Sequence, residues 1–251
     1  MTSDDTEATY PPLNTLKPVA PDLWIVDGPI IHFGVLPGFK MPFPTRMTVI
    51  RVGGDLFIHS PTPLLPTLQA EIEAAGRVRW IVGPNRIHYW WIPEWKTAFT
   101  GAEVWLAPRI EEQAKGHIAP GFLTLDREAG YPWDETIATL PVGGSFMTEV
   151  VFFHRPTRTL VLADLIENFE SHKVGSLALR WLTKLGGVAA PDGQTPRDLR
   201  ATFAKRRPEM KAAVEKMIAW NPDRMIIAHG RWFETAGTSE LRRSFRWLLD
   251  D

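Results

Sequence analysis

Short runs of alternating apolar and polar residues dominate the first quarter of the chain. Residues 46–52 alternate as a strand with one buried face should. Gly53-Gly54-Asp55 then predicts a hairpin turn, and residues 56–59 predict the return strand. Upstream of them, β-branched and aromatic residues predict strands over 23–27 and 30–33, and a Gly/Pro-rich loop is expected over 34–44. This part of the chain is therefore expected to be an antiparallel β meander.

The hydrophobic period changes after this meander. Apolar residues recur on one helical face over residues 64–75 and stop at Gly76, which predicts an amphipathic helix with Thr62 as its N-cap. A buried strand over 78–82 follows directly. Together with the strand before the helix, this makes a β-α-β unit.

The rest of the chain continues this mixture of short strands and amphipathic helices. Further strands are predicted over 103–107, 137–140, 149–153, 159–163 and 225–228, and further helices near 93–99 and over 177–185, 197–220 and 239–249, with a variable segment over 108–136 that holds one weak helix. The strands 149–153 and 159–163 should form a hairpin. Pro208 is expected to split or kink the helix 197–220, because proline removes an intrahelical hydrogen bond.

Composition places the chain among ordinary globular proteins. It has 251 residues, of which 44% are hydrophobic and 23% are charged, which is enough to bury a full core. We expect a polar N-terminal arm over 1–20 and a single domain over 21–251. No apolar run reaches the roughly 18 residues of a membrane-spanning helix, and the N-terminus has no signal-peptide pattern. We therefore expect a cytoplasmic protein.

Charge and cysteine content narrow the chemistry. The formal net charge of −1 gives no global reason to expect nucleic acid or a membrane as the partner, although local patches can still exist. A small-molecule substrate or ligand is the expected partner, and homo-oligomerisation stays open. The absence of cysteine excludes disulfides, thiolate nucleophiles and cysteine-ligated zinc, so a metal site must use His, Asp, Glu or water.

Three polar residues share one position relative to predicted strands. His88 follows strand 78–82, Asp164 follows strand 159–163, and His229 follows strand 225–228. Side chains released at the same end of adjacent strands can converge on one point. Two histidines and one aspartate suit Zn²⁺, or else Fe or Mn, and His59 at the end of strand 56–58 could join them. The alternative is that each residue only forms hydrogen bonds at the end of its strand.

The segment around His88 is the predicted centre of the site. After the break at Gly83-Pro84 it presents Asn85 and Arg86 and then an aromatic run that includes Trp90 and Trp91. We expect these four side chains to contribute to substrate binding. The competing interpretation is that the tryptophans belong to the core and that Asn85 forms a local turn.

The order of elements and several motifs carry a family resemblance. The sequence of β meander, β-α-β unit, strand-Asp and strand-His-Gly resembles the metallo-β-lactamase-like αββα sandwich, an α/β fold in which an aspartate bridges two metals and a final strand-end histidine completes the site. More closely, the chain resembles the branch called domain of unknown function 4336, over about residues 22–170 and more weakly through Ala228-His229-Gly230. The motifs that carry this resemblance are Pro44-Thr45-Arg46-Met47, His59-Ser60-Pro61, Pro84-Asn85-Arg86-Ile87-His88, Glu149-Val150-Val151-Phe152-Phe153-His154, Thr159-Leu160 and Asp164-Leu165-Ile166-Glu167-Asn168.

The chain departs from the hydrolases of that superfamily at the metal ligands. Those enzymes carry a His-x-His-x-Asp-His run where this chain has only His88, and their middle histidine would fall within residues 141–145, which contain none. The resemblance with this degenerate motif implies a mononuclear site of His88, Asp164 and His229, with or without Glu149 or His59 as a further ligand, and with a water position left open.

Such a site predicts metal-dependent hydrolysis of an ester, lactone or phosphoester. The metal would lower the pKa of its water and polarise the substrate oxygen. Glu149 and His59 are the candidate general bases, and Arg46 and Arg86 are the candidate anchors for an anionic substrate. Each role has a structural rival, such as an ion pair for Glu149 or a solvent-facing strand position for Arg46.

Two other function classes stay open. The loss of most of the ligand run is also the change expected if the fold became a non-catalytic binding or assembly module, with the tryptophans as the contact surface and no metal cofactor. An oxidoreductase-type use of bound iron is a third interpretation.

Overall fold

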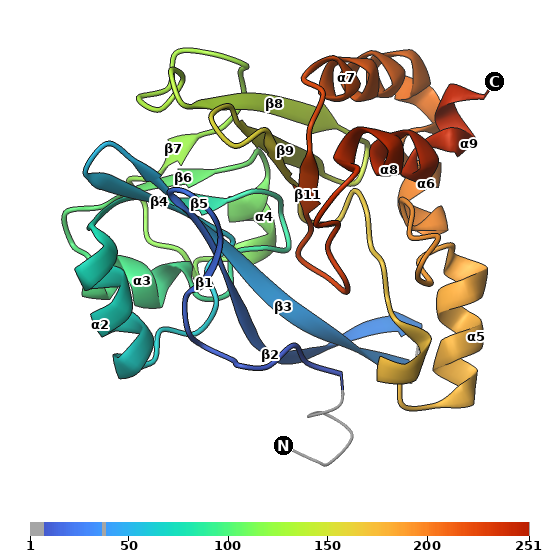
Figure 1. Cartoon of the computed structure of the whole chain (residues 1–251), viewed down its shortest axis with the longest axis horizontal. Helices are drawn as coiled ribbons and strands as arrows, with labels where there is room; N and C mark the ends of the chain where they lie inside the picture. Colours follow the sequence, from blue (N-terminus) through green and yellow to red (C-terminus); the bar gives the residue numbers. More distant parts are fainter. Residues whose placement is uncertain (1–7, 37–38, 251) are drawn as a thin grey trace.

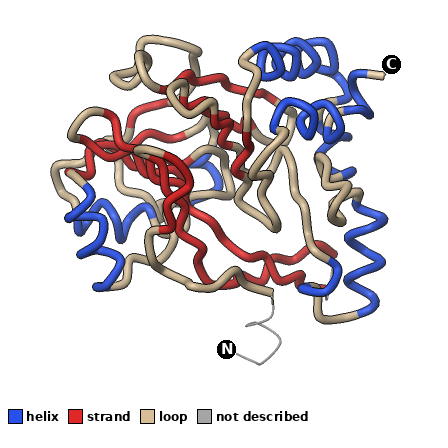
Figure 2. The backbone as a smooth tube through the Cα atoms, in the orientation of Figure 1, coloured by secondary structure: helices blue, strands red, loops and turns tan. Residues whose placement is uncertain are grey.

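The computed structural model describes residues 8–36 and 39–250, which form two β-sheets (Figures 1 and 2). One sheet has the order β1 (Lys17–Ala20), β2 (Leu23–Leu36), β3 (Phe39–Val52), β4 (Asp55–His59), β5 (Arg77–Gly83), β6 (Glu103–Leu106) and β7 (Leu123–Thr124). The other has the order β11 (Arg224–Ile226), β10 (Thr159–Val161), β9 (Thr148–His154) and β8 (Ile137–Gly143). Strands β1 to β4 are antiparallel, whereas β4 to β7 are parallel, which confirms the predicted meander and β-α-β unit. The strands predicted separately over 23–27 and 30–33 are one strand, β2, with an irregularity in register between Asp27 and Ile30.

Helices cover the outer faces of both sheets. They are α2 (Pro66–Ala75), α3 (Ile92–Ala98), α4 (Ile110–Ala114), α5 (Leu177–Gly186), α6 (Arg197–Thr202), α7 (Arg207–Ala219), α8 (Gly237–Ser244) and α9 (Arg246–Leu249), with 3-10 turns at Ser171–Lys173 and Ala204–Arg206. Figure 1 shows α2 and α3 on one side of the molecule and α7 and α8 on the opposite side. The layers are therefore helix, sheet, sheet and helix, which confirms the predicted αββα sandwich. Among the described helices, none has the length and apolar composition needed to cross a membrane.

Aromatic side chains fill the space between the two sheets. Trp133 is buried, and its ring makes edge contacts with those of Phe57 at 4.9 Å and Trp80 at 5.5 Å. Phe57 from β4 also contacts Phe152 from β9 at 5.1 Å, which joins the two sheets directly. Most of the tryptophan-rich composition is thus explained by packing, and this packing fixes the sheet ends that carry the site.

The Gly/Pro-rich loop predicted over 34–44 is largely wrong. Strands β2 and β3 are long and pair through this region, with Ile30 opposite Pro44 and His32 opposite Pro42. Strand β3 pairs with β4 only over Thr48–Val52, so its earlier part has one open edge. Proline is tolerated there because its nitrogen can face the edge that has no partner strand. Residues 37–38 of the predicted loop lie outside the described residues.

One predicted helix signal is wrong, and a second is correct only in part. Thr62 is not the cap of α2, which begins after Leu65 with Pro66 in its first turn, where a missing N–H costs nothing. The predicted helix 197–220 is split, as expected, but the break comes before Pro208: α6 ends at Thr202, and Pro208 lies in the first turn of α7. In both cases proline lies in the first turn of a helix, a preference that the sequence prediction did not consider.

The described part of the expected N-terminal arm packs on the domain. Strand β1 pairs with β2, and the Tyr10 hydroxyl donates a hydrogen bond to Glu170 at 2.9 Å. Residues 1–7 of the expected arm lie outside the described residues.

Candidate metal centre

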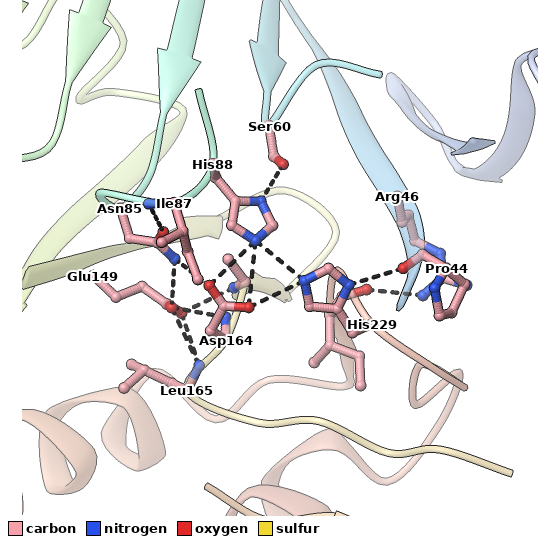
Figure 3. A network of polar contacts seen from close by, with 12 residues as sticks. Pro44, Arg46, Ser60, Asn85, Ile87, His88, Glu149, Asp164, Leu165 and His229 are labelled. Atoms are coloured by element: carbon pink, nitrogen blue, oxygen red, sulfur yellow. Dashed lines mark hydrogen bonds and ion pairs between the residues drawn. The ribbon is translucent and has the colours of Figure 1, made fainter. Parts of the chain in front are cut away.

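The side chains of His88, Asp164 and His229 converge at one point, as their strand-end positions predict. His88 follows β5 of the larger sheet, whereas Asp164 and His229 follow β10 and β11 of the smaller one. One nitrogen or oxygen from each residue lies within 4.8 Å of the others. Figure 3 shows the two imidazole rings and the carboxylate turned toward one another. The site is therefore built across the junction of the two sheets.

The spacing of these atoms suits a small divalent cation. Nε2 of His88 lies 3.2 Å from Nε2 of His229 and 3.3 Å from Oδ1 of Asp164, and the latter oxygen lies 3.1 Å from Nε2 of His229. Ligands at zinc-bond lengths in a tetrahedron are separated by about 3.3 Å, so the three atoms match one face of such a tetrahedron. Histidine and aspartate are also ligands that Zn²⁺ accepts. The residues present therefore fit a single metal ion with one position left open.

Each histidine is oriented through its other nitrogen. Nδ1 of His229 donates a hydrogen bond to the Pro44 carbonyl at 2.8 Å. A carbonyl only accepts, so Nδ1 carries a proton, and Nε2 is the nitrogen that is turned toward the site. Nδ1 of His88 lies 2.6 Å from the Ser60 hydroxyl, which fixes that ring in the same sense. The open edge of β3 leaves the Pro44 carbonyl free for this role.

Sequence reasoning missed both of these orienting groups. Ser60 directly follows His59, and its place in the His59-Ser60-Pro61 motif was the available signal. No sequence signal identifies the Pro44 carbonyl, because it lies 185 residues from the histidine that it binds.

The Asn85 amide links the carboxylates of Asp164 and Glu149. Nδ2 of Asn85 donates to Oδ2 of Asp164 at 2.6 Å and to Oε2 of Glu149 at 3.1 Å. Asn85 also accepts from the N–H of Ile87, which is the local turn considered above. Its side chain is completely buried, so its described contacts are internal. Substrate binding by Asn85 stays a prediction.

Glu149 lies behind Asp164, and its oxygens bind the backbone. They accept hydrogen bonds from the N–H groups of Ala163 at 2.9 Å, Asp164 at 2.7 Å and Leu165 at 3.2 Å. Burial and the negative charge of Asp164 raise the pKa of Glu149 to about 7, although the backbone donors oppose this shift. These contacts show Glu149 as an anchor for the turn that carries Asp164, and its predicted action as a general base stays a prediction.

The charges of the site favour an ionised aspartate and a protonated His88 when no metal is present. Burial alone would raise the pKa of Asp164, but the imidazoles of His88 and His229 outweigh it and hold the pKa well below its usual range. Burial likewise opposes the charged form of His88, but the Asp164 carboxylate raises the pKa of that imidazole above its ordinary value. A cation at this point would replace the proton on His88.

His59 is buried beside the site at the end of β4. Its ring makes an edge contact with Phe152 at 5.5 Å, and its Nε2 has no hydrogen-bond partner among the described residues. Burial and the neighbouring His88 lower the pKa of His59 to about 3. The ring is therefore neutral at physiological pH and has one unused polar atom.

The two predicted anchor arginines have different surroundings. Arg46 is buried, pairs with Asp27 at 2.7 Å, and donates to the carbonyls of Ile227 and Gly230 at 2.8 Å each. It thus holds the backbone on both sides of His229, and its predicted substrate contact stays untested.

Arg86 lies near the surface of the segment that carries His88. It donates to the carbonyl of Phe146 at 2.8 Å and to the side chain of Gln113 at 3.0 Å. Its guanidinium also lies over the Phe146 ring, 4.9 Å from the centroid. These contacts hold Arg86 on the loop that follows β8, and substrate anchoring by Arg86 stays a prediction.

The aromatic run after His88 is divided between core and surface. Trp90 is half exposed and stacks on Tyr89 at 5.4 Å, whereas Trp91 is partly buried against the main core. Trp95 is buried completely and donates to the Thr62 carbonyl at 2.7 Å. Trp90 is therefore the member of this run that has free surface to offer a ligand.

Comparison with known proteins agrees with this fold. Residues 31–185 match the family described as Domain of unknown function (DUF4336), a span that includes His88 and Asp164 but ends before His229. No curated protein matches the chain significantly.

Solved structures of metallo-β-lactamases resemble the chain over almost its full length. The enzyme from Pontibacter korlensis has a TM-score of 0.61 at 11% identity, covering 94% of this chain and 99% of that one. The enzyme from Hirschia baltica has a TM-score of 0.58 at 16% identity, covering 93% and 96%. FIM-1 from Pseudomonas aeruginosa, solved in its mono-zinc form, has a TM-score of 0.57 at 14% identity, covering 94% and 95%. These similarities establish a shared fold.

Proposed function

Because the chain belongs to the DUF4336 family and has the metallo-β-lactamase fold, we propose that it is a metal-dependent hydrolase with a single metal ion held by His88, Asp164 and His229. The observation that carries this proposal is the triangle of three donor atoms separated by 3.1 to 3.3 Å. Three side chains from distant parts of the chain would not keep two imidazole nitrogens and a carboxylate oxygen so close without a shared proton or cation between them.

The mono-zinc form of FIM-1 supports one metal rather than two. It shows that a chain with this fold can hold a single zinc ion. In the present chain, Asn85 bonds to both Asp164 and Glu149 beside the triangle. An amide donor in that place gives each carboxylate a hydrogen bond without a second cation, which agrees with a mononuclear site.

The proposed roles follow from the contacts. When bound, Zn²⁺ or another divalent ion polarises a substrate oxygen and lowers the pKa of water at the open position. Ser60 and the Pro44 carbonyl keep the two imidazoles in the binding orientation, and Glu149 keeps Asp164 in place. The neutral His59, with its unused Nε2, is the remaining candidate for a hydrogen bond to a reacting group.

The proposed substrate is a small ester, lactone or phosphoester. Arg86 and the half-exposed Trp90 lie in the segment that carries His88, which suits an anionic group and an apolar group respectively.

Metal analysis tests this proposal without knowledge of the substrate. The protein is purified without a histidine tag, and its metal content is measured by elemental analysis, beside His88→Ala, Asp164→Ala and His229→Ala. His172→Ala serves as the control, because His172 is exposed and does not belong to the group of three ligands. We expect about one metal per chain in the parent and the control and its loss in the three variants. Sub-stoichiometric metal that none of the variants changes would overturn the proposal.

A second candidate function is a binding module without catalysis, and one observation favours it. The side chains of His88, Asp164 and His229 are only 10%, 5% and 4% exposed, which leaves little of the site open to a substrate. A metal bound stoichiometrically, together with no hydrolysis of esters, lactones or phosphodiesters, would select this candidate. Hydrolysis that disappears in Asp164→Ala would select the enzyme.

A further inference from the structure

Helix α5 presents an apolar stripe to solvent. Leu177, Trp181 and Leu185 are 74%, 66% and 62% exposed, and they are the three most exposed large apolar side chains of the described residues. They are spaced four residues apart, so they lie along one face of the helix. Figure 1 shows α5 at the right-hand edge of the molecule, beside the far ends of β2 and β3.

The opposite face of the same helix is firmly attached. Leu179 packs against a small cluster that includes Phe43 and Val188, and Thr183 is buried. The Ser176 side chain caps the first turn by accepting from the N–H of Leu179 at 3.1 Å. The helix is therefore attached to the rest of the protein by its inner face, and the apolar stripe on its outer face has a fixed position.

The charged side chains of the segment 171–191 are all cations, and Lys184 is the one that meets the stripe, whereas Lys173 and Arg180 donate to the carbonyls of Thr9 and Val174. Residues 171–191 contain Lys173, Arg180 and Lys184 but no aspartate or glutamate. The ammonium of Lys184 lies over the Trp181 ring, 5.7 Å from its centroid, so a cation borders the apolar stripe directly. The chain as a whole has a net charge of −1, which makes this patch local.

We propose that α5 binds the surface of an anionic membrane, with its apolar stripe between the lipid headgroups and its cations on the lipid phosphates. An exposed Trp/Leu face bordered by lysine and arginine is the pattern of helices that lie in the membrane interface. A second copy of this chain fits less well, because a symmetric contact would bring two patches of the same positive sign together. This proposal departs from the expectation of no membrane partner, which rested on the net charge of the whole chain.

Vesicle co-sedimentation of the full chain tests the proposal. The measurement uses vesicles of phosphatidylcholine alone and of phosphatidylcholine mixed with phosphatidylglycerol, in EDTA, so that the result does not depend on the metal site. We expect binding to the anionic vesicles that weakens with salt. The triple variant Leu177→Ser/Trp181→Ser/Leu185→Ser should bind at least about tenfold more weakly, and Lys184→Gln about fivefold more weakly.

A matched control separates this stripe from apolar surface in general. The double variant Leu65→Ser/Leu123→Ser removes two other exposed apolar side chains, which are 44% and 42% exposed, and should bind as the parent does. Circular dichroism of each variant checks that the fold is kept. We expect this because the replaced side chains are exposed and contribute little to the core.

Three outcomes would overturn the proposal. They are no binding of the parent to anionic vesicles, unchanged binding of the triple variant, and sedimentation equilibrium that shows a parent dimer, a monomeric triple variant and no vesicle binding. The last result would assign the stripe to a second copy of the chain. None of these outcomes bears on the metal analysis, so the two proposals fail independently.

Discussion

Replacing Glu149 by alanine should destabilise the protein strongly even when no metal is present. The Glu149 carboxylate is completely buried and accepts from the backbone N–H groups of Ala163, Asp164 and Leu165. Each buried N–H left without an acceptor costs about 1–3 kcal/mol. Burial of the carboxylate is itself unfavourable and offsets part of that sum, so we expect a net loss of about 3–5 kcal/mol in the free energy of unfolding.

The loss expected for Glu149→Ala is a large share of the roughly 5–15 kcal/mol that stabilises a domain. Glu149→Gln is therefore the more informative variant. The glutamine carbonyl can keep some of the N–H bonds, but its NH₂ group then faces donors, including the Asn85 amide. We expect a loss of about 1–3 kcal/mol. Urea unfolding at pH 8 in EDTA, followed by circular dichroism, measures both variants.

The control and the refuting result separate an anchor from a base. Glu135→Gln changes an exposed glutamate and should stay within about 0.5 kcal/mol of the parent. If Glu149 acts only in proton transfer, Glu149→Ala will change neither the free energy of unfolding nor the metal content. A loss below about 1 kcal/mol for that variant would refute the anchoring argument.

Three further predictions concern the same region. Ser60→Ala should weaken zinc binding by about tenfold, measured by competition with a chelating dye, while the thermal midpoint of the metal-free protein changes little, because only the orientation of His88 is lost. Arg46→Met should lower the free energy of unfolding by about 3–5 kcal/mol, because it leaves Lys17 as the remaining cation on the buried Asp27 and removes the donor to the carbonyls of Ile227 and Gly230. Arg51→Met, at an exposed pair with Asp22, should cost no more than about 1 kcal/mol. The folded-state pKa of Glu149 is raised from 4.5 to about 7, so the folded state gains stability from proton binding at Glu149 below pH 4.5, and this proton-dependent part alone is lost as the pH rises through 7. The backbone hydrogen bonds to Glu149 remain above that window. In EDTA the free energy of unfolding of the parent, relative to Glu149→Gln, should fall across this window, and a difference that stays flat would contradict the assignment.

The parts of the site that local sequence rules can reach were predicted. His88, Asp164 and His229 each follow a strand with a clear apolar pattern, and the ends of such strands are local features. The three side chains then converge because the fold places these strand ends next to one another.

The parts that depend on register between distant strands were not predicted. The Ser60 hydroxyl meets His88 because β4 and β5 are parallel neighbours, and the Pro44 carbonyl meets His229 because β3 runs past β11 with an open edge. The same register explains the failed loop over 34–44, since prolines that look like loop residues are accommodated where one side of a strand is unpaired.

The origin of the three ligands on two different sheets has a consequence for folding. His88 is separated by 76 residues from Asp164 and by 141 residues from His229, and its strand belongs to the other sheet. A cation held by all three would act as a cross-link that closes long loops, so it can form only after both sheets have come together, and it would resist their separation as a disulfide does in a secreted protein. In a chain without cysteine, such an ion would replace a covalent cross-link. The lifetime of the folded state would then depend on the supply of metal.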